Sequence, residues 1–341
     1  MHKTLKRLSL VSLVCIFLVV LAGSIVRMTG SGMGCPDWPK CFGYYIPPTD
    51  IETLTWSEGK EFQKGNIVIR NDSLFVAQSD FTTSDKYDDK NWRHYTKHDY
   101  AIFNPTHTWV EFINRLIGAL TGIPVLLLFV VSIFHMKRDP LVTTLAFAGV
   151  LLLGFEAWLG KEVVDGNLIP HQITYHMLGA IALVGLYTLL TIRLTSFGVV
   201  FKARRDKTIV ILGVVSLTLI LVQIILGTTV REQVDAISKT ELLKSKDWLD
   251  KLGIQFLIHR SFSIAVLIVQ LIFAIRVIRT RSISTWPRIL IVILFLEILA
   301  GMGLAYLDMP GSLQPLHLFL AILNFSLVVT VIGIYLRKTT Y

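Results

Sequence analysis

Long apolar runs, separated by polar or charged segments, dominate the hydrophobic pattern of this chain. A membrane-spanning helix needs about 20 predominantly apolar residues to cross about 30 Å of hydrocarbon, and these runs have that length. The pattern predicts eight spans, at residues 8–28, 108–134, 141–160, 171–195, 208–230, 255–278, 287–307 and 314–336. The expected fold class is therefore an all-α integral membrane protein embedded in the lipid bilayer.

Two long polar segments interrupt this pattern. Residues 46–104 follow the first span, and within them Asn66–Arg70 and Leu74–Ala77 flank the turn residues Asn71-Asp-Ser, which predicts a small β-hairpin. Residues 232–253 follow the fifth span, and their many Lys, Glu and Asp residues favour a partly helical loop. Neither segment carries a catalytic motif, so each is interpreted as a lid, a docking surface or a plain insertion.

The chain also repeats its own pattern. Glu156 precedes His176 by 20 residues, and Glu297 precedes His317 by the same 20. The other recurring segments are Gly23-Ser-Ile-Val-Arg27 with Gly227-Thr-Thr-Val-Arg231, Asn114-Arg115 with His259-Arg260, and Glu156-Ala-Trp-Leu-Gly160 with Glu297-Ile-Leu-Ala-Gly301. Because four spans return a chain to the side where it started, the repeat predicts two pseudo-symmetric four-helix bundles in the same orientation.

The predicted halves are residues 1–195, which include the outer loop 46–104, and residues 196–341.

The loops on one side hold 16 of the 33 Lys and Arg residues but only two acids, Asp139 and Asp206. The positive-inside rule makes this the cytoplasmic side of the cell inner (plasma) membrane, with both termini inside. The net charge of +9 follows from this topology and gives no sign of a nucleic-acid surface.

Two cysteines lie in the first outer loop, within Gly34-Cys-Pro-Asp-Trp-Pro-Lys-Cys41. Disulfides persist on the outer side of the membrane, so a bridge between Cys35 and Cys41 is expected. A pair of free thiols in a turn is the alternative, and a bridge there could also be redox active.

A polar residue follows the outer entry of each even-numbered span: Asn114, His176, His259 and His317. Heme iron takes axial ligands from opposite faces of its ring, and two neutral imidazoles on facing helices supply such ligands. The second half meets this requirement with His259 and His317. Zinc is the weaker alternative, because no third and fourth ligand at metal spacing is found.

Arginines near these histidines are candidates to bind the heme propionates. Arg231 and Arg260 are interpreted in this way. Arg27 and Arg115 occupy the equivalent places in the first half and remain undecided between propionate clamps and anchors at the membrane surface. The buried acids Glu156 and Glu297 must be protonated or partnered; a structural role is preferred over proton transfer.

The residues resemble the heme A synthase family of the terminal oxidase assembly pathway. The resemblance covers all eight spans and misses the two long outer loops. It rests on the segment from Gly23 to Cys41, on Glu111-Phe-Ile-Asn-Arg115, and on His176, His259-Arg260 and His317. It implies an enzyme that oxidises a methyl group of heme O to the formyl group of heme A by successive hydroxylations.

The resemblance also implies roles for single residues. His259 and His317 would ligate a resident heme b, and His176 would face the iron of the substrate heme. Glu111 matches a family carboxylate that could relay protons or stabilise a cationic intermediate; an interfacial acid at the start of the span is the alternative. The implied partners are heme O, a heme O synthase that delivers it and an electron donor, with a homo-oligomer also possible.

Asn114 departs from the family pattern, which has a histidine at this place. An amide oxygen is a weak iron ligand but a good hydrogen-bond acceptor. Three accounts follow. The substrate heme is held by His176 alone, with the opposite iron face open; or His107, about 10 Å nearer the surface, replaces the missing ligand; or the synthase activity is lost.

The third account leads to the alternative function, a non-catalytic b-type heme protein that transfers electrons within the membrane. A transporter built on the four-span repeat is a further alternative, but the paired histidines are not needed for it. The ordered set of motifs favours the enzyme.

Overall fold

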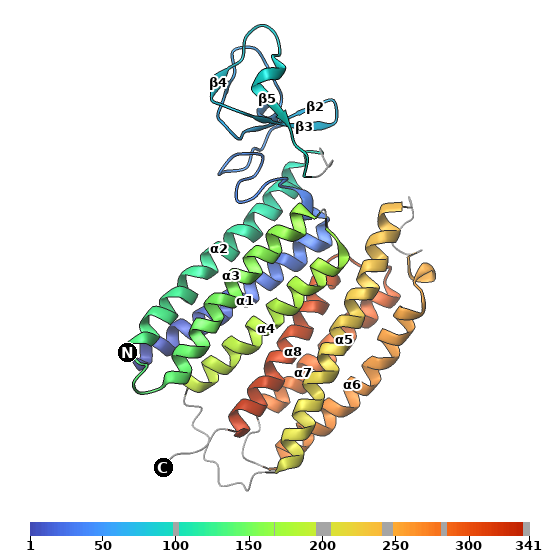
Figure 1. Ribbon diagram of the computed structural model, residues 1–341. Coiled ribbons are helices and arrows are strands. Elements are labelled where there is room, and N and C mark those ends of the chain that lie inside the picture. The colour runs from blue at the N-terminus through green and yellow to red at the C-terminus, as the bar shows by residue number, and fades with distance from the viewer. Residues whose placement is uncertain (98–101, 167, 196–205, 241–247, 281–284, 337–341) are drawn as a thin grey trace. The chain divides into compact units, whose positions relative to one another are not determined.

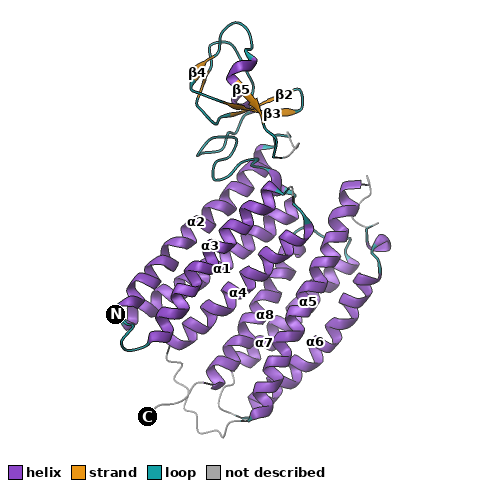
Figure 2. Cartoon of the chain, viewed as in Figure 1, coloured by secondary structure: helices purple, strands orange, loops and turns teal. Residues whose placement is uncertain are grey.

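The computed structural model describes residues 1–97, 102–166, 168–195, 206–240, 248–280 and 285–336 (Figures 1 and 2). Eight long helices make up most of these residues. They are α1 (His2–Thr29), α2 (Pro105–Ile133), α3 (Pro140–Asp165), α4 (Pro170–Leu194), α5 (Lys207–Thr240), α6 (Ile254–Arg279), α7 (Thr285–Tyr306) and α8 (Leu313–Leu336). Each helix contains one of the eight apolar runs, so the predicted spans are confirmed as helices.

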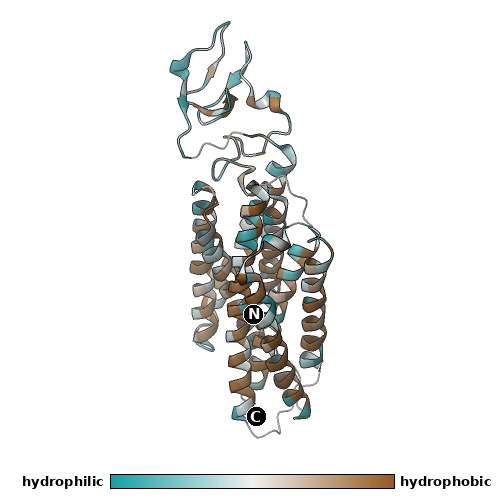
Figure 3. Ribbon diagram, turned by 90° about the vertical axis from the view of Figure 1, so that its right-hand side faces the viewer, coloured by the Kyte–Doolittle hydropathy of each residue, from teal (hydrophilic) through white to brown (hydrophobic). Residues whose placement is uncertain are grey.

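All eight helices are long and apolar enough to cross a membrane. Figure 3 shows hydrophobic residues along the middle of the helices and hydrophilic residues concentrated toward their ends. On α6, Ile264, Ile268 and Ile272 follow one another at four-residue spacing and are all exposed, so they form one apolar stripe on the helix surface. Such stripes are suited to contact with lipid chains, and the chain is a multi-pass membrane protein.

Helix α5 continues ten residues beyond the predicted end of its span, to Thr240. The extension is held by an ion pair between Arg231 and Asp235, whose charged atoms lie 2.7 Å apart. Residues four apart lie on the same helix face, and an opposite-charge pair there stabilises the helix. The expectation of a partly helical loop after residue 232 is confirmed for the described residues.

The last four helices form a bundle in which α5 packs against α6 and α8, and α7 packs against the same two helices. Phe273 and Val328 lie in its core and are fully buried. Gly213 has no room for a side chain, since an added Cβ would lie 2.6 Å from Ile332. One four-helix bundle is therefore observed, while its pseudo-symmetry with the first four helices stays a prediction.

The chain divides into two compact units, which are described separately. The first unit comprises Met1–Ser24, Thr121–Leu153 and Met177–Tyr341, and the second comprises Ile25–Leu120 and Gly154–His176. In the first unit, α4 packs against α8 through a 2.9 Å hydrogen bond between Thr188 and Ser326. The predicted division into residues 1–195 and 196–341 stays a prediction.

The second unit contains a small β region. Strands β2 (Ile67–Arg70) and β3 (Ser73–Ala77) pair antiparallel, and β5 (Trp92–His94) joins β3. Asn71 and Asp72 form the turn with φ angles of 49° and 54°, as a tight hairpin turn requires. The predicted hairpin is thus confirmed.

Among the described residues, the remaining elements are two short strands of this region and four short 3₁₀ helices, within it and elsewhere along the chain. Strand β1 (Glu61–Phe62) pairs with β4 (Phe81–Thr82). The 3₁₀ helices are η1 (Ser31–Met33), η2 (Ile51–Leu54) and η3 (Asp89–Asn91), with η5 (Leu249–Lys251) preceding α6. Two-residue strands are too short to show an alternating pattern, which is why the sequence predicts neither β1 nor β4.

Candidate functional site

Two imidazoles face each other inside the C-terminal bundle. His259 lies in the second turn of α6 and His317 in the second turn of α8. Their ring centroids are 6.5 Å apart and their planes are perpendicular. Two imidazoles on opposite sides of one metal ion, each with a metal–nitrogen bond of about 2 Å, have centroids about 6 Å apart. The pair therefore has the spacing that a six-coordinate heme iron requires.

The ring of His317 is oriented by a backbone contact. Its Nδ1 lies 3.0 Å from the carbonyl oxygen of Glu297. A carbonyl oxygen only accepts hydrogen bonds, so Nδ1 carries the proton and the lone pair of Nε2 is available to a metal. On the facing helix, the backbone carbonyl of His259 accepts a 3.0 Å hydrogen bond from Gln223 of α5. His317 is thus suited to act as a neutral ligand, while Nδ1 of His259 has no hydrogen-bond partner among the described residues.

A glycine on the neighbouring helix lies against each imidazole. An added Cβ on Gly227 would lie 3.1 Å from Cε1 of His259, and one on Gly301 would lie 3.1 Å from Cε1 of His317. The same arrangement recurs in the other unit with Gly160 and His176, but at 3.5 Å. Glycines such as Gly160 and Gly301 allow close contact between neighbouring membrane helices. The structure shows that they make room for a histidine ring.

These distances predict different effects of the same substitution. Gly301→Ala should displace His317 by a few tenths of an ångström and shift the α and β absorbance bands of any heme bound there. Gly160→Ala should leave the spectrum unchanged, because 3.5 Å is an ordinary contact distance. Absorbance spectra of the reduced proteins, recorded at equal heme content, test this. Equal shifts in both variants would contradict it.

The carboxyl group of Glu297 is partnered by a residue that the sequence interpretation missed. Asn324 of α8, which is 1% exposed, donates a 2.8 Å hydrogen bond from Nδ2 to Oε2 of Glu297. An uncompensated polar group is costly in the membrane interior, so this pair supports the structural role expected for Glu297. The signal available in the sequence was an amide side chain in the middle of the apolar part of α8.

The two predicted propionate arginines lie in different surroundings. Arg231 pairs with Asp235 on its own helix and also contacts Gln314 of α8. Arg260 is exposed, and its guanidinium carbon lies 5.8 Å from the centroid of the Phe256 ring. Their role toward propionates stays a prediction.

In the second unit, His176 of α4 lies beside Glu156 of α3. Oε2 of Glu156 is 2.7 Å from Nδ1 of His176. The amide oxygen of Asn114 is buried and has no hydrogen-bond partner among the described residues, so it is available to a bound group. No hydrogen bond joins Asn114 to His176 in the described part of the chain. The role of both residues at a substrate heme stays a prediction.

Helix α2 carries three further candidate residues, His107, Glu111 and Arg115. Asn104 accepts hydrogen bonds from the backbone N–H groups of Thr106 and His107, at 3.0 and 3.2 Å, and Pro105 takes the first helical position, which needs no donor. The cap fixes the start of the helix, and Glu111 and Arg115 follow four residues apart on one face. His107 lies in the first turn, where its backbone contacts Gly34.

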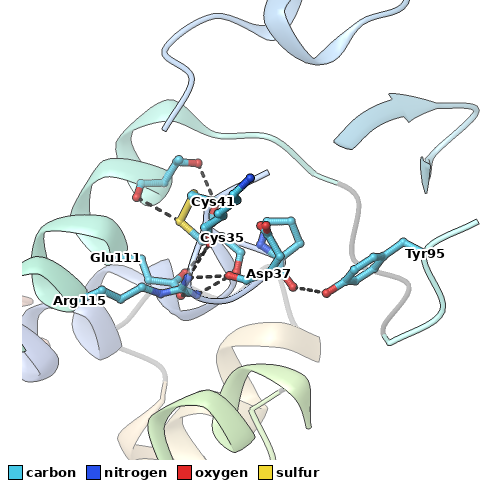
Figure 4. Close-up of polar contacts among 10 residues, drawn as sticks. Cys35, Asp37, Cys41, Tyr95, Glu111 and Arg115 are labelled. Carbon is cyan, nitrogen blue, oxygen red and sulfur yellow. Dashed lines mark hydrogen bonds and ion pairs between the residues drawn. A yellow bond between two sulfur atoms is a disulfide. The ribbon is translucent and has the colours of Figure 1, made fainter. Parts of the chain in front are cut away.

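Glu111 is 3% exposed and is held by the disulfide loop, which is residues 35–41 (Figure 4). The predicted disulfide between Cys35 and Cys41 is present. The backbone N–H of Cys35 donates a 2.9 Å hydrogen bond to Oε2 of Glu111, while Arg115 pairs with Oε1. The acid is therefore buried against the loop and is not an exposed interfacial group.

Arg115 binds the same loop beside the carboxyl group of Glu111 (Figure 4). Its guanidinium donates hydrogen bonds to the carbonyl oxygens of Asp37, Lys40 and Cys35, at 2.6, 3.1 and 3.1 Å. Thr108 of α2 adds a 2.8 Å hydrogen bond to the carbonyl of Gly34. Arg115, undecided from the sequence, thus holds the loop; its donors are engaged there.

Two groups at the disulfide loop, Asp37 within it and Tyr95 against it, have a raised pKa. Burial raises the pKa of Asp37, against the lowering effect of the Gly43 N–H that it accepts at 2.9 Å and of the Arg115 charge. Burial also raises the pKa of Tyr95, whose hydroxyl donates a 2.6 Å hydrogen bond to the carbonyl of Pro36. Tyr95 therefore stays a donor at neutral pH and ties the segment after β5 to the loop.

Comparison with known proteins finds related sequences along most of the chain. A family model described as COX15-CtaA, cytochrome oxidase assembly protein, matches residues 6–72 and 81–329. A protein named heme A synthase from Shewanella oneidensis is 28% identical over 245 residues, which cover 72% of this chain and 62% of that protein. Proteins with the same name from Rickettsia africae and Rickettsia bellii are each 22% identical; the matches cover 94% and 96% of this chain and 94% and 97% of those proteins.

Proposed function

Because the chain belongs to the COX15-CtaA family of cytochrome oxidase assembly proteins, we propose that it is a heme A synthase. Membership confirms the resemblance drawn from the sequence, and relatives named heme A synthase favour the enzyme over the electron-transfer alternative. The proposed reaction oxidises a methyl group of heme O to a formyl group by successive hydroxylations, giving heme A for terminal oxidases.

The observation that carries the proposal is the His259 and His317 pair. Its 6.5 Å centroid separation and the contact of His317 Nδ1 with the Glu297 carbonyl suit a permanently bound heme. We assign this site to heme b. When bound there, the heme supplies electron transfer to the reaction; the residues of the chain hold it in a fixed orientation.

The substrate heme O is assigned to His176, with Asn114 toward the opposite face. His176 offers one ring nitrogen to the iron, and the amide of Asn114 offers a hydrogen bond in place of a second ligand. An iron with one open face is able to react with oxygen. The missing family histidine is thus compatible with catalysis.

Glu111 is the proposed catalytic residue. Its carboxyl group is buried, and the Cys35 N–H and Arg115 fix both of its oxygens. A carboxyl group held in this way can take up or release a proton next to the methyl group being oxidised. Arg115 and the disulfide loop keep the carboxyl group in one orientation.

The proposal also includes location and partners. The positive-inside pattern supports the cell inner (plasma) membrane with both termini in the cytoplasm. Heme O is supplied by a heme O synthase, and a separate donor supplies electrons.

Analysis of extracted hemes tests the proposed reaction. The protein is expressed together with a heme O synthase in cells that lack their own heme A synthase, and the hemes are separated by chromatography. Heme A and its hydroxymethyl precursor are expected. If only heme O and heme b are recovered from cells that contain the folded protein, the electron-transfer alternative is favoured.

Asn114→His should change how the substrate heme is bound. A second imidazole would close the open iron face, so we expect a six-coordinate, bis-histidine spectrum for heme O, while the His259 and His317 heme is unaffected. Turnover should be retained, because the family pattern has a histidine at this place. Absorbance spectroscopy and heme analysis of the same samples test both points. An unchanged spectrum of bound heme O would show that residue 114 does not face its iron.

A further inference from the structure

The buried acid Glu156 lies in contact with His176, which is a proposed heme ligand. The side chain of Glu156 is 6% exposed, whereas that of His176 is 43% exposed, and the two are 2.7 Å apart. Among the described residues neither oxygen of Glu156 nor Nδ1 of His176 makes a hydrogen bond, so the contact between them is one of charge and proximity. The buried acid therefore lies beside an imidazole that is itself partly exposed.

The equivalent acid in the C-terminal bundle behaves differently. Oε2 of Glu297 accepts a hydrogen bond from Asn324 at 2.8 Å, and Nδ1 of His317 lies 3.0 Å from the main-chain carbonyl of Glu297. Asn324 follows His317 by seven residues, and the residue seven positions after His176 is Leu183, which has no donor. Glu297 in the second half therefore has an amide partner, Asn324, whereas the position equivalent to Asn324 in the first half offers Glu156 no such partner.

Other charged groups near Glu156 are engaged elsewhere. Lys161 of the same helix pairs with Glu162 at 3.1 Å and with Asp165 at 2.8 Å. Asp165 also accepts from Lys97 at 3.1 Å. These contacts form a separate network at the outer end of α3. The contact between Glu156 and His176 is therefore not part of a general surface charge cluster.

We infer that Glu156 is a positioning residue that holds the Nδ1 side of His176 by its close contact, and that the group beside Nδ1 sets the substrate site apart from the permanent heme site. The inference rests on the proposed assignment of heme O to His176. The negative charge of a carboxylate beside the ring makes the imidazole a more electron-donating ligand than a neutral carbonyl does, and it lowers the reduction potential of the iron. His317, which contacts a carbonyl, is the weaker donor of the two.

The division has a chemical rationale. An electron-rich ligand favours reaction of the iron with oxygen, while a neutral ligand pair is suited to electron transfer. One inherited pattern, an acid 20 residues before a histidine, would thus serve two purposes. The presence or absence of the amide at the seventh residue after the histidine decides which one.

The experiment compares Glu156→Gln with its counterpart Glu297→Gln, in protein that carries the resident heme and is titrated with isolated heme O. Glutamine keeps the size of the side chain but replaces the carboxylate by a neutral amide. We expect Glu156→Gln to bind heme O roughly 10- to 100-fold more weakly, as for other partners of ligating histidines. The reduction potential of the bound heme O should move to more positive values. In Glu297→Gln, the affinity for the resident heme should stay within a few fold, because the backbone carbonyl still contacts His317.

Spectroelectrochemical titration gives the potentials, and His176→Ala identifies which heme belongs to the first half. Thermal unfolding of the variants checks that both glutamine proteins are folded. Unchanged affinity and potential of heme O in folded Glu156→Gln would overturn the inference and leave the proposed function intact. If His176→Ala itself binds heme O normally, the proposed assignment of the substrate site fails, and the inference fails with it.

Discussion

His317→Ala is expected to remove the resident heme from the C-terminal bundle, whereas His176→Ala is expected to leave it bound. The substitution deletes one of the two imidazoles whose centroids are 6.5 Å apart and leaves His259 as the only ligand. Loss of a partner behind a ligand lowers metal affinity about 10- to 100-fold, so loss of the ligand itself should lower heme affinity by at least about 100-fold.

The measurement is the heme content of the purified protein, with the bis-histidine α and β bands recorded in the reduced state. His259→Ala should give the same loss, since the two ligands act on one iron. His135→Ala is the matched control, because His135 lies outside the proposed sites, in the segment between α2 and α3. Retention of the resident heme in both ligand variants would overturn the division of the chain into a heme-holding half and a substrate half.

The eight helices could be predicted from the sequence because their signal is local. An apolar run of sufficient length has few alternatives to a membrane-spanning helix. The hairpin was predictable for the same reason, since Asn71 and Asp72 tolerate the positive φ angles of its turn. The continuation of α5 to Thr240 was predicted only as a partly helical loop, because its extent depends on helix-stabilising polar contacts and not on hydropathy.

The histidines of the site were also visible in the sequence, because a repeat with fixed spacing is itself a pattern. Their partners were not. Glu156 and Glu297 have identical spacing to the following histidine but make different contacts: Glu156 lies beside His176, whereas Glu297 accepts a hydrogen bond from Asn324 on another helix. Arg115 binds three backbone carbonyls, which are acceptors that every residue carries. A sequence therefore gives no sign of which carbonyls will converge on one side chain.

Glu111→Gln is expected to stop the conversion of heme O while the resident heme stays bound. Glutamine keeps the length of the side chain. It also keeps an oxygen that can accept the hydrogen bond from the Cys35 N–H, which Glu111 accepts at 2.9 Å. It loses the ability to exchange a proton and weakens the pairing with Arg115. General acid–base catalysis contributes about 10²- to 10⁴-fold to a rate, and the turnover of heme O should fall by an amount in this range.

Glutamine is preferred to alanine because of the surroundings of this acid. Glu111 and Arg115 are buried with side chains 3% and 15% exposed, and removing one partner of a buried ion pair costs about 3–5 kcal/mol. Glu111→Ala could therefore lose activity through a displaced loop. Glu162→Gln, at a half-buried site on α3, is the control for a change of charge in the same unit and should retain activity.

Three measurements separate catalysis from structure in Glu111→Gln. Heme A and its hydroxymethyl precursor report turnover, absorbance of the reduced protein reports the resident heme, and mass spectrometry reports whether the Cys35–Cys41 disulfide is intact. Loss of turnover with the other two unchanged assigns a proton-transfer role to Glu111. Full turnover would show that the carboxyl group serves only to hold the disulfide loop, because the amide can accept the Cys35 hydrogen bond but cannot transfer a proton. Since the loop is fixed to α2 through Arg115 as well, that outcome would leave the loop in place and shift the search for the catalytic group to the other buried acid of the same unit, Glu156.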